Sequence, residues 1–395
     1  MAFPFQLRRA PPVTLQLLSR CAAPVALVAF SQCHDVGGSA LMDRDTHIDR
    51  AAPGRISPTA SMRVARAVHT ATTLPDGRAL ILGGFTDTRH AAESAEAYDP
   101  ATKRFTALPR MLTVRHSHTA TLLPNGKVLI VGGYSEGNAT VALAELFDPT
   151  SNSFVATGSL TSPRAGHIAV PLPSGKVLIA GGVGPGWSFL ASAEVYDPAT
   201  GRFSRTGDMT VARESHAAVR LSDGRILIVG GHRDRRANIT LYASAEMYDA
   251  TSGAFSRTGD MGIRRHKHDA VLLRDGRVLV TGGSDERDDR GAYSATELFD
   301  PRSGTFSPGP AMRRTRYKHN GTSVPLPDGT VLIAGGAADA EIYHATSGRF
   351  ELVAGDARLA GQFSAATPLA DGSVLITGGY GNGGGPRAAA WLYHR

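Results

Sequence analysis

Seven short apolar runs recur along the chain, and each ends in two glycines. One is "NGKVLIVGG" at 125–133; the others read "DGRALILGG", "SGKVLIAGG", "DGRILIVGG", "DGRVLVTGG", "DGTVLIAGG" and "DGSVLITGG". Their first glycines are Gly83, Gly132, Gly181, Gly230, Gly282, Gly335 and Gly378, so the spacings are 49, 49, 49, 52, 53 and 43 residues. An apolar run bounded by a turn signal and by glycine is typical of a short buried strand. Its recurrence at a nearly constant period indicates a repeat architecture.

Each repeat contains three more strand-like pieces. In the second repeat they are "HTATLLP" (118–124), "LAELFDP" (143–149) and "NSFVATG" (152–158). These pieces are short, rich in residues that favour strands, and bounded by Gly, Pro, Asn and Asp. No helical period runs through the repeats. Four antiparallel strands in each unit, repeated radially, predict an all-β, seven-bladed β-propeller.

Aromatic residues recur at two further positions of the repeat. The third strand carries Tyr98, Phe147, Tyr196, Tyr248, Phe299 or Tyr343, and the fourth carries Phe105, Phe154, Phe203, Phe255, Phe306 or Phe350. Together with the diglycine, this pattern resembles the kelch repeat, over residues 54–395. Kelch repeats usually have Trp at the last position, where this chain always has Phe. The resemblance implies a kelch β-propeller in which the glycines are structural. A phosphate-binding loop would instead need a following helix, and the sequence predicts none there.

The two ends of the repeat region complete each other. The seventh unit ends in "AAAWLYHR" without a fourth strand. Residues 54–69, "GRISPTASMRVARAVH", align without a gap with residues 201–216, "GRFSRTGDMTVARESH", which contain a fourth strand. We therefore expect the N-terminal strand to complete the seventh blade, which would leave no open sheet edge.

The segment before the repeats is typical of an export signal. The apolar run "CAAPVALVAF" (21–30) follows Arg8, Arg9 and Arg20, and such a run behind positive charge indicates a secretory signal over residues 1–32. Two processing routes remain open: cleavage before Gln32, or lipidation of Cys33. A polar linker (33–53) follows. We expect an exported protein that is periplasmic, secreted or an outer-surface lipoprotein, with membrane attachment only through a lipid on Cys33.

Composition limits the classes of partner. The 395 residues carry a net charge of +7, without a basic helix or interleaved aromatic platform, so we expect no nucleic acid partner. The only cysteines, Cys21 and Cys33, precede the repeats, so neither a disulfide framework nor a cysteine-ligated zinc site is expected within them. We expect a monomer.

The loops fall into two classes. Turns between strands one and two, such as "PDG", and between strands three and four, such as "DPATGR", are alike in every repeat and share one face, the turn face. Loops between strands two and three lie on the opposite face, the loop face. They vary from "HRDRRANITLYAS" to a nearly absent "AADA". Variable loops on a rigid scaffold are where binding sites are usually placed.

An Arg-x-x-His pattern leads into the first strand of six repeats. Its members are Arg66/His69, Arg115/His118, Arg164/His167, Arg213/His216, Arg265/His268 and Arg316/His319. Six histidines around a channel mouth could suggest a metal site. Because the pairs keep the repeat period, we instead interpret them as structural, with hydrogen bonds from one blade to the next. The recurring glutamates of the third strands have the same interpretation, and we assign no metal, cofactor or catalytic residue.

Basic residues that break the period gather in the fourth to sixth repeats. This basic sector consists of Arg235, Arg236, Arg264, Arg265, His266, Arg313, Arg314, Arg316 and Tyr317. Guanidinium groups bind carboxylates, sulfates and phosphates in bidentate fashion. The sector therefore predicts contacts to an anionic ligand at the loop face, although a merely solvated basic surface is the competing interpretation.

Two functions remain open. The first is a binding module whose loop face contacts a partner protein or an anionic glycan. The second is an enzyme. The kelch resemblance implies two precedents: galactose oxidase-like copper enzymes, which need a cysteine that these repeats lack, and N-acetylneuraminate mutarotases, kelch propellers that handle a sugar acid. No catalytic residue can be matched to either, so the sequence favours the binding module.

Overall fold

The computed structural model describes residues 54–86, 90–235, 238–355, 361–381 and 384–395. The predicted signal segment (1–32), the linker and Cys33 lie outside these residues. Within the described part, no helix has the length and apolar character needed to cross a membrane.

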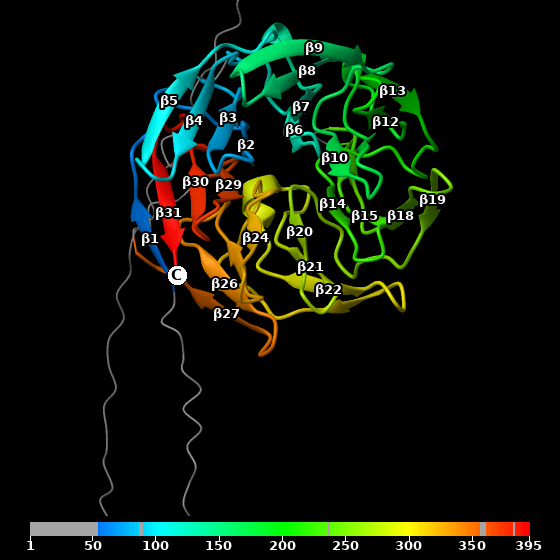
Figure 1. Cartoon of the computed structure of the whole chain (residues 1–395). Coiled ribbons are helices and arrows are strands. Elements are labelled where there is room, and N and C mark those ends of the chain that lie inside the picture. The colour runs from blue at the N-terminus through cyan, green and yellow to red at the C-terminus, as the bar shows by residue number, and fades with distance from the viewer. Residues whose placement is uncertain (1–53, 87–89, 236–237, 356–360, 382–383) are drawn as a thin grey trace, which may run out of the picture. The chain divides into compact units, whose positions relative to one another are not determined.

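The described residues form the seven blades that the repeats predict, arranged in a ring around a central channel (Figure 1). Each blade has four antiparallel strands, and the chain runs through them from the inner strand to the outer. Blades one to three are β2 (Thr70–Thr73) to β5 (Arg104–Leu108), β6 (Thr119–Leu122) to β9 (Ser153–Ser159), and β10 (Ile168–Pro171) to β13 (Arg202–Arg205). Blade four is β14 (Ala217–Arg220), β15 (Ile226–Val229), β18 (Ala245–Asp249) and β19 (Ala254–Arg257). Blades five and six are β20 (Asp269–Leu272) to β23 (Thr305–Pro308) and β24 (Ser323–Pro325) to β27 (Arg349–Leu352).

The intermediate strands of these blades follow the same register in each repeat. They are β3 (Ala79–Leu82), β4 (Ala95–Asp99), β7 (Val128–Val131), β8 (Leu143–Asp148), β11 (Val177–Ala180), β12 (Ala193–Asp197), β21 (Val278–Thr281), β22 (Thr296–Asp300), β25 (Val331–Ile333) and β26 (Glu341–His344). The kelch-like aromatics face each other across the third and fourth strands, as in the Tyr98–Phe105 pair, whose ring centroids are 4.8 Å apart.

The N-terminal strand closes the ring as predicted. Blade seven consists of β29 (Ala365–Pro368), β30 (Val374–Thr377), β31 (Ala390–His394) and β1 (Arg55–Pro58), with β1 antiparallel to β31. A short strand, β28 (Ala354–Gly355), pairs in parallel with the outer side of β1. The closing strand is thus hydrogen-bonded on both sides, which protects an edge that would otherwise be open to other chains.

The core lies between neighbouring blades. All four residues of β7 are buried, as are those of the other complete second strands. Leu80 and Leu82 of blade one pack in one cluster with Val128, Ile130 and Phe147 of blade two. Because both faces of each blade are covered by a neighbour, the second strands are continuous apolar runs without alternation.

The diglycines permit close approach between blades. At Gly132 (φ 61°), an added Cβ would lie 2.4 Å from the carbonyl oxygen of Arg164 and 2.7 Å from the His167 ring. The next glycine, Gly133 (φ 97°), would collide with the His116 carbonyl. Glycine therefore meets both a steric and a conformational requirement. The groups that approach belong to the links between blades.

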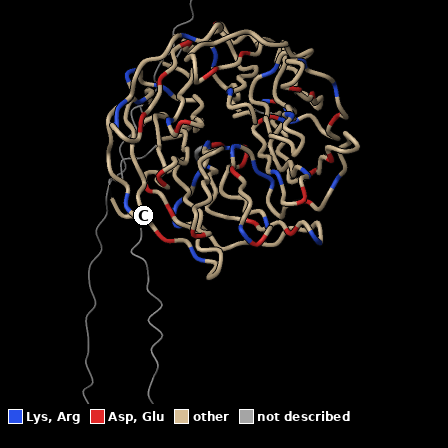
Figure 2. Tube along the Cα trace, viewed as in Figure 1, with Lys and Arg blue, Asp and Glu red and all other residues tan. Residues whose placement is uncertain are grey.

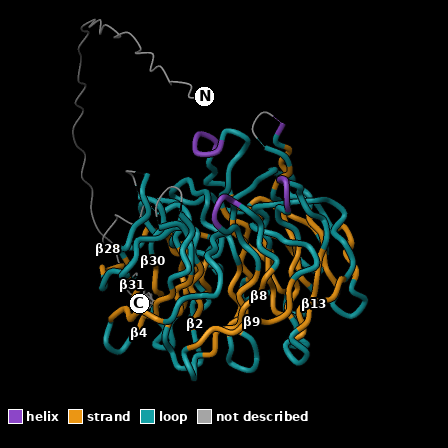
Figure 3. Tube along the Cα trace, turned by 90° about the horizontal axis from the view of Figure 1, so that it is seen from above, coloured by secondary structure: helices purple, strands orange, loops and turns teal. Residues whose placement is uncertain are grey.

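The long loops and the 3₁₀ turns gather on the loop face, at the top of Figure 3. The turns are η1 (Glu136–Asn138), η2 (Pro185–Trp187) and η4 (Asp288–Gly291). Blade four adds a hairpin of β16 (His232–Arg233) and β17 (Thr240–Leu241).

Candidate functional site

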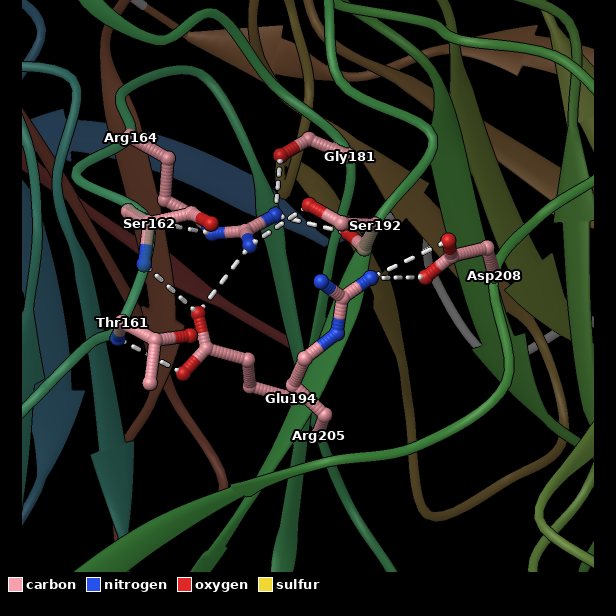
Figure 4. A network of polar contacts seen from close by, with 8 residues as sticks. All are labelled: Thr161, Ser162, Arg164, Gly181, Ser192, Glu194, Arg205 and Asp208. Atoms are coloured by element: carbon pink, nitrogen blue, oxygen red, sulfur yellow. Dashed lines mark hydrogen bonds and ion pairs between the residues drawn. The ribbon is translucent and has the colours of Figure 1, made fainter.

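The repeat-locked arginines form buried clamps. Arg164 Nη1 donates to the carbonyl oxygens of Gly181 and Ser192 at 2.9 and 2.8 Å, and Nη2 lies 3.2 Å from Glu194 Oε1 (Figure 4). The Glu194 carboxylate also accepts the backbone N–H groups of Thr161 and Ser162. Since a buried charge is tolerated only when it is paired and hydrogen-bonded, each clamp fastens the link between two blades to the blade that it enters.

All six clamps have the same design. The Arg–Glu distances lie between 2.6 and 3.2 Å for Arg66–Glu96, Arg115–Glu145, Arg164–Glu194, Arg213–Glu246, Arg265–Glu297 and Arg316–Glu341. All six arginine side chains are fully buried. The recurring third-strand glutamates are therefore partners of these arginines.

Two other groups of the Arg-x-x-His pattern make bonds between blades: the backbone carbonyl of the arginine and the side chain of the histidine. The carbonyl oxygen of the link arginine accepts the N–H of the second glycine of the preceding blade, as Arg164 does from Gly133 at 2.9 Å. His167 Nε2 lies 3.0 Å from Thr119 Oγ1 of the preceding blade. His118 makes the equivalent contact to Thr70 of a first strand, whereas His69 and His319 contact Thr377 and Thr281 at the ends of second strands. The arginine side chain thus acts within one blade, whereas its carbonyl and the histidine act between blades.

The six histidines are held neutral. Burial lowers the pKa of His69, His167 and His319 to about 3, and it takes the pKa of His118, His216 and His268 well below the usual range. Within the described part of the chain, no three His, Cys, Asp or Glu side chains are grouped so that they could hold a metal ion.

The structure corrects the position of four members of the basic sector. Arg265 and Arg316 are fully buried clamp residues, while His266 and Tyr317 are 1% and 5% exposed. The guanidinium groups are inside because they occupy the repeat-locked position, and their charge is already bound by Glu297 and Glu341.

The other described members are exposed, but they already have partners. Arg264 faces Glu286 at 3.7 Å, and Arg314 Nε donates to Asp339 at 2.6 Å. Arg313 Nε donates to the Phe350 carbonyl at 3.3 Å. Arg235 pairs with Glu214. Arg236 lies outside the described residues. Basic and acidic residues are interspersed around the ring (Figure 2), so the sector is not a continuous basic surface.

Two non-repeating positions at the loop face carry chemistry that the sequence interpretation missed. The residue after five of the six clamp arginines pairs by a β-bridge with the residue after the diglycine, as in His116–Tyr134 and Glu214–His232. The first position is held by Ala67, His116, Ala165, Glu214, His266, Tyr317 and Gln362, if the seventh unit is counted by alignment. The sequence contains a signal for this position, because its residue differs between most blades while the arginine and histidine of the same link recur. Their pairing across the link required the structure.

A row of acid and imidazole groups connects blades four and five. Glu214 Oε2 lies 3.5 Å from His232 Nε2, and His232 Nδ1 lies 3.2 Å from His266 Nδ1. His266 Nε2 faces Asp288 Oδ1 at 3.4 Å, and Lys267 Nζ donates to the same oxygen at 2.6 Å. This row can hold or pass a proton between the two loops.

Burial and charge determine how the row is protonated. Burial raises the pKa of Glu214, and burial also lowers the pKa of His232 to about 3. The contacts of His266 and Lys267 hold the pKa of Asp288 below its usual range. These shifts favour neutral imidazoles on His232 and His266 and an ionised Asp288, and they make the Glu214 carboxyl easier to protonate than an exposed one.

Aromatic rings follow one another across the first three blades. The ring centroids of Phe85 and His116 are 3.8 Å apart, those of His116 and Tyr134 are 5.2 Å apart, and those of Tyr134 and Trp187 are 5.5 Å apart. The guanidinium carbon of Arg235 lies 3.8 Å from the centroid of the Trp187 ring. Since these residues come from separate loops, the rigid ring of blades brings them together.

A recess of about 630 Å³ lies on the loop face between blades six and seven. Its lining residues are Lys318, Gly336, Ala337, Ala338, Gln362, Tyr380, Gly381 and Gly384. Blade six has the shortest link between strands two and three, "AADA", so little chain covers this place. Among the lining residues that the structure describes, Lys318 is the only charged one.

The central channel, of about 450 Å³, contains one carboxyl that breaks the repeat. Asp269 Oδ2 accepts the N–H groups of Thr322 and Ser323 at 3.0 and 2.8 Å. The segment between the link histidine and the first turn is two residues longer in blade six than in blade five: Asp328 follows His319 by nine residues, whereas Asp275 follows His268 by seven. The carboxylate stabilises this insertion, so Asp269 has a structural role.

Comparison with known proteins agrees with this architecture. Residues 166–210 match the family model of the Kelch motif. No curated protein matches the chain. A fungal alcohol oxidase of the AA5 family, in complex with copper, superposes with a TM-score of 0.67 at 16% identity over 86% of this chain and 76% of that chain. The structure of YjhT gives a TM-score of 0.57 at 14% identity over 84% and 95%.

At these identities, the two solved structures show a shared fold alone. Copper in the oxidase raises the question of whether this chain has suitable ligands. The described residues contain no group of side chains that could hold a metal ion, and both cysteines precede them. We therefore assign no copper site to the described propeller.

Proposed function

We propose that this chain, a kelch-repeat β-propeller, is an exported binding module that takes up an acidic carbohydrate at its loop face. The observation that supports the proposal is the recess between blades six and seven, with Lys318 in its wall. Its volume of about 630 Å³ is in the range of small-molecule sites. Export rests on the apolar run at 21–30 behind its arginines.

The Lys318 backbone is fixed at the recess. Its φ is 55°, and its N–H donates to the Lys267 carbonyl at 2.8 Å while its own carbonyl accepts the N–H of Phe363 at 2.8 Å. The ammonium group lies 4.6 Å from the centroid of the Tyr317 ring and 5.4 Å from that of Phe363. A cation that is already positioned loses less entropy when it binds an anion.

The other polar lining groups are uncharged. Gln362 accepts from Lys318 Nζ at 3.4 Å, and Tyr380 contributes a phenol. An ammonium group suits a carboxylate, whereas amide and phenol groups suit hydroxyls. A sugar acid carries both kinds of group.

The alternative function is an enzyme that acts on a sugar acid. The Glu214–His232–His266–Asp288 row is the observation that favours it, because a carboxyl group next to imidazoles can take part in acid–base chemistry. None of these four residues lines the recess. The binding module therefore fits the geometry better.

Thermal unfolding of the full chain tests the proposal. Glucuronic acid and N-acetylneuraminic acid should raise Tm, since a ligand of the native state stabilises it by mass action, and glucose should not. Lys318→Gln should abolish the rise. Lys103→Gln is the matched control, because Lys103 also has a φ of 55° but lies in the β4–β5 turn on the turn face. Equal shifts for acidic and neutral sugars, or a rise that persists in Lys318→Gln, would contradict the proposal.

A further inference from the structure

Trp187 is an exposed aromatic residue in an unusual backbone conformation. It is 46% exposed at the end of η2, whereas the other tryptophan, Trp391, is 4% exposed. Its φ is 63°, in the left-handed region that bulky residues rarely adopt. Such conformations persist where the surroundings enforce them, and they concentrate at functional sites.

Neighbouring groups hold the indole in place. The Arg235 guanidinium lies over the ring at 3.8 Å, and its Nη2 donates to Glu214 Oε2 at 3.2 Å. The Glu214 side chain is itself only 12% exposed, so this anchor is fixed in the loop face. The guanidinium covers one side of the indole, and the rest of the ring remains exposed.

A second observation indicates an incomplete set of contacts here. The hydroxyl of Tyr134, whose ring lies next to Trp187, is buried and has no hydrogen-bond partner among the described residues. An unpartnered buried hydroxyl is costly. The half-exposed indole of Trp187 therefore lies next to a buried tyrosine hydroxyl that has no partner within the described part of the chain.

We propose that Trp187, backed by Arg235 and Glu214, is a stacking platform for a neutral pyranose ring. A pyranose has an apolar C–H face that packs on an aromatic ring and hydroxyls at its edge that bond to polar groups of a protein. The Arg235 charge is already compensated by Glu214, so the platform has no net charge that would favour an acidic ring. This inference rests on the proposed function and extends it: the natural ligand is an oligosaccharide that contains neutral as well as acidic sugars.

Tryptophan fluorescence of the full chain tests the platform. The probes are cellotetraose and chitotetraose, which are neutral, and glucuronic acid, which is not. A neutral oligosaccharide should protect the exposed Trp187 from quenching by acrylamide, and Trp187→Phe should remove the protected signal because Trp391 is buried. By calorimetry, Trp187→Ala should weaken binding of the neutral oligosaccharide by about tenfold. Arg235→Ala should weaken it less, because the indole remains but loses its support.

Two controls separate this inference from the proposed function. Leu112→Ala removes another exposed apolar side chain, 58% exposed, and should leave binding of both kinds of sugar unchanged. Lys318→Gln should abolish binding of glucuronic acid but not of the neutral oligosaccharide. If the acid binds as expected and neither neutral oligosaccharide protects Trp187, the platform is wrong and the recess stands. Protection by an unglycosylated peptide digest without protection by sugars would also overturn it.

Discussion

Arg213 and Glu214 are neighbours in the chain, but they belong to two different parts of the molecule. Arg213 is one of six equivalent clamp residues, fully buried and paired with Glu246 at 2.7 Å. Glu214 occupies a position that holds different residues in most blades, and it contacts Arg235 and His232 at the loop face. The comparison shows that residues which keep the repeat period hold the blades together. Residues that break it at the loop face are free to carry a specific function.

Removal of the closing strand should have the largest effect on the repeated part. Deletion of residues 54–60 removes β1, which leaves the edges of β31 and β28 unpaired. We expect an insoluble or multimeric product, because open edges pair with other chains. Size-exclusion chromatography measures this, with Arg55→Ala as the control that keeps the strand. A monomeric deletion variant with an unchanged Tm would contradict closure by the N-terminal strand.

The adjacent pair Arg213 and Glu214 gives the next largest contrast. Arg213→Ala leaves the Glu246 carboxylate buried without its cation, which should cost about 3–5 kcal/mol of unfolding free energy. Glu214→Ala should cost less than about 2 kcal/mol, because its partner Arg235 is 45% exposed and can be hydrated. Chemical denaturation gives both values. Equal losses would mean that the repeat period does not separate the two roles.

The pH dependence of stability should have opposite signs in the two parts. The buried histidines His69, His167 and His319 have a pKa of about 3 in the folded state, whereas the unfolded chain takes up their protons near pH 6.5. Stability should therefore fall as the pH drops below about 6.5, by about 1.4 kcal/mol per pH unit for each histidine once the unfolded form is protonated.

Glu214 should act in the opposite direction. Its pKa is raised by burial, so its protonated form contributes stability that is lost as the pH rises through the folded-state value. Profiles of Tm against pH for the native chain and Glu214→Gln separate the two effects. The variant should keep the acid limb of the histidines and lose the decline that begins as the pH rises above the ordinary pKa of a glutamate. A variant profile parallel to the native one over the whole range would contradict the assignment.

The exposed arginines of the basic sector should have the smallest effect. Arg264→Ala and Arg314→Ala remove ion pairs of half-exposed side chains, which typically contribute less than about 1 kcal/mol. Titration with glucuronic acid should give the same affinity as in the native chain. A large loss of affinity in these variants would move the anion site from the recess to the basic sector.

Much of the fold could be predicted from the sequence, because the repeat shows the same residues in the same roles several times. The diglycines gave the number of blades, and the alignment of residues 54–69 with 201–216 gave the closing strand. The repeat also contained the information that Arg265 and Arg316 are buried, since both stand at the clamp position. They were assigned to a basic surface because charged residues are frequent around them, although the repeat period already placed them at the clamp position.

The candidate site was less predictable, for three physical reasons. Lys318 lines a recess only because the short link of blade six leaves it uncovered, and this depends on the heights of neighbouring loops. The Glu214–His232 contact forms across a link that joins two blades. Asp269 binds backbone N–H groups of an insertion that lies more than fifty residues further along the chain, and this contact depends on how blades five and six are placed.

Isothermal titration of glucuronic acid and of glucose into the full chain, Lys318→Gln and Lys103→Gln tests the central claim most directly. The account predicts that glucuronic acid binds the native chain and Lys103→Gln with the same affinity, that Lys318→Gln shows no binding, and that glucose binds none of the three. Binding of glucuronic acid to Lys318→Gln with the native affinity would show that the recess between blades six and seven is not the site.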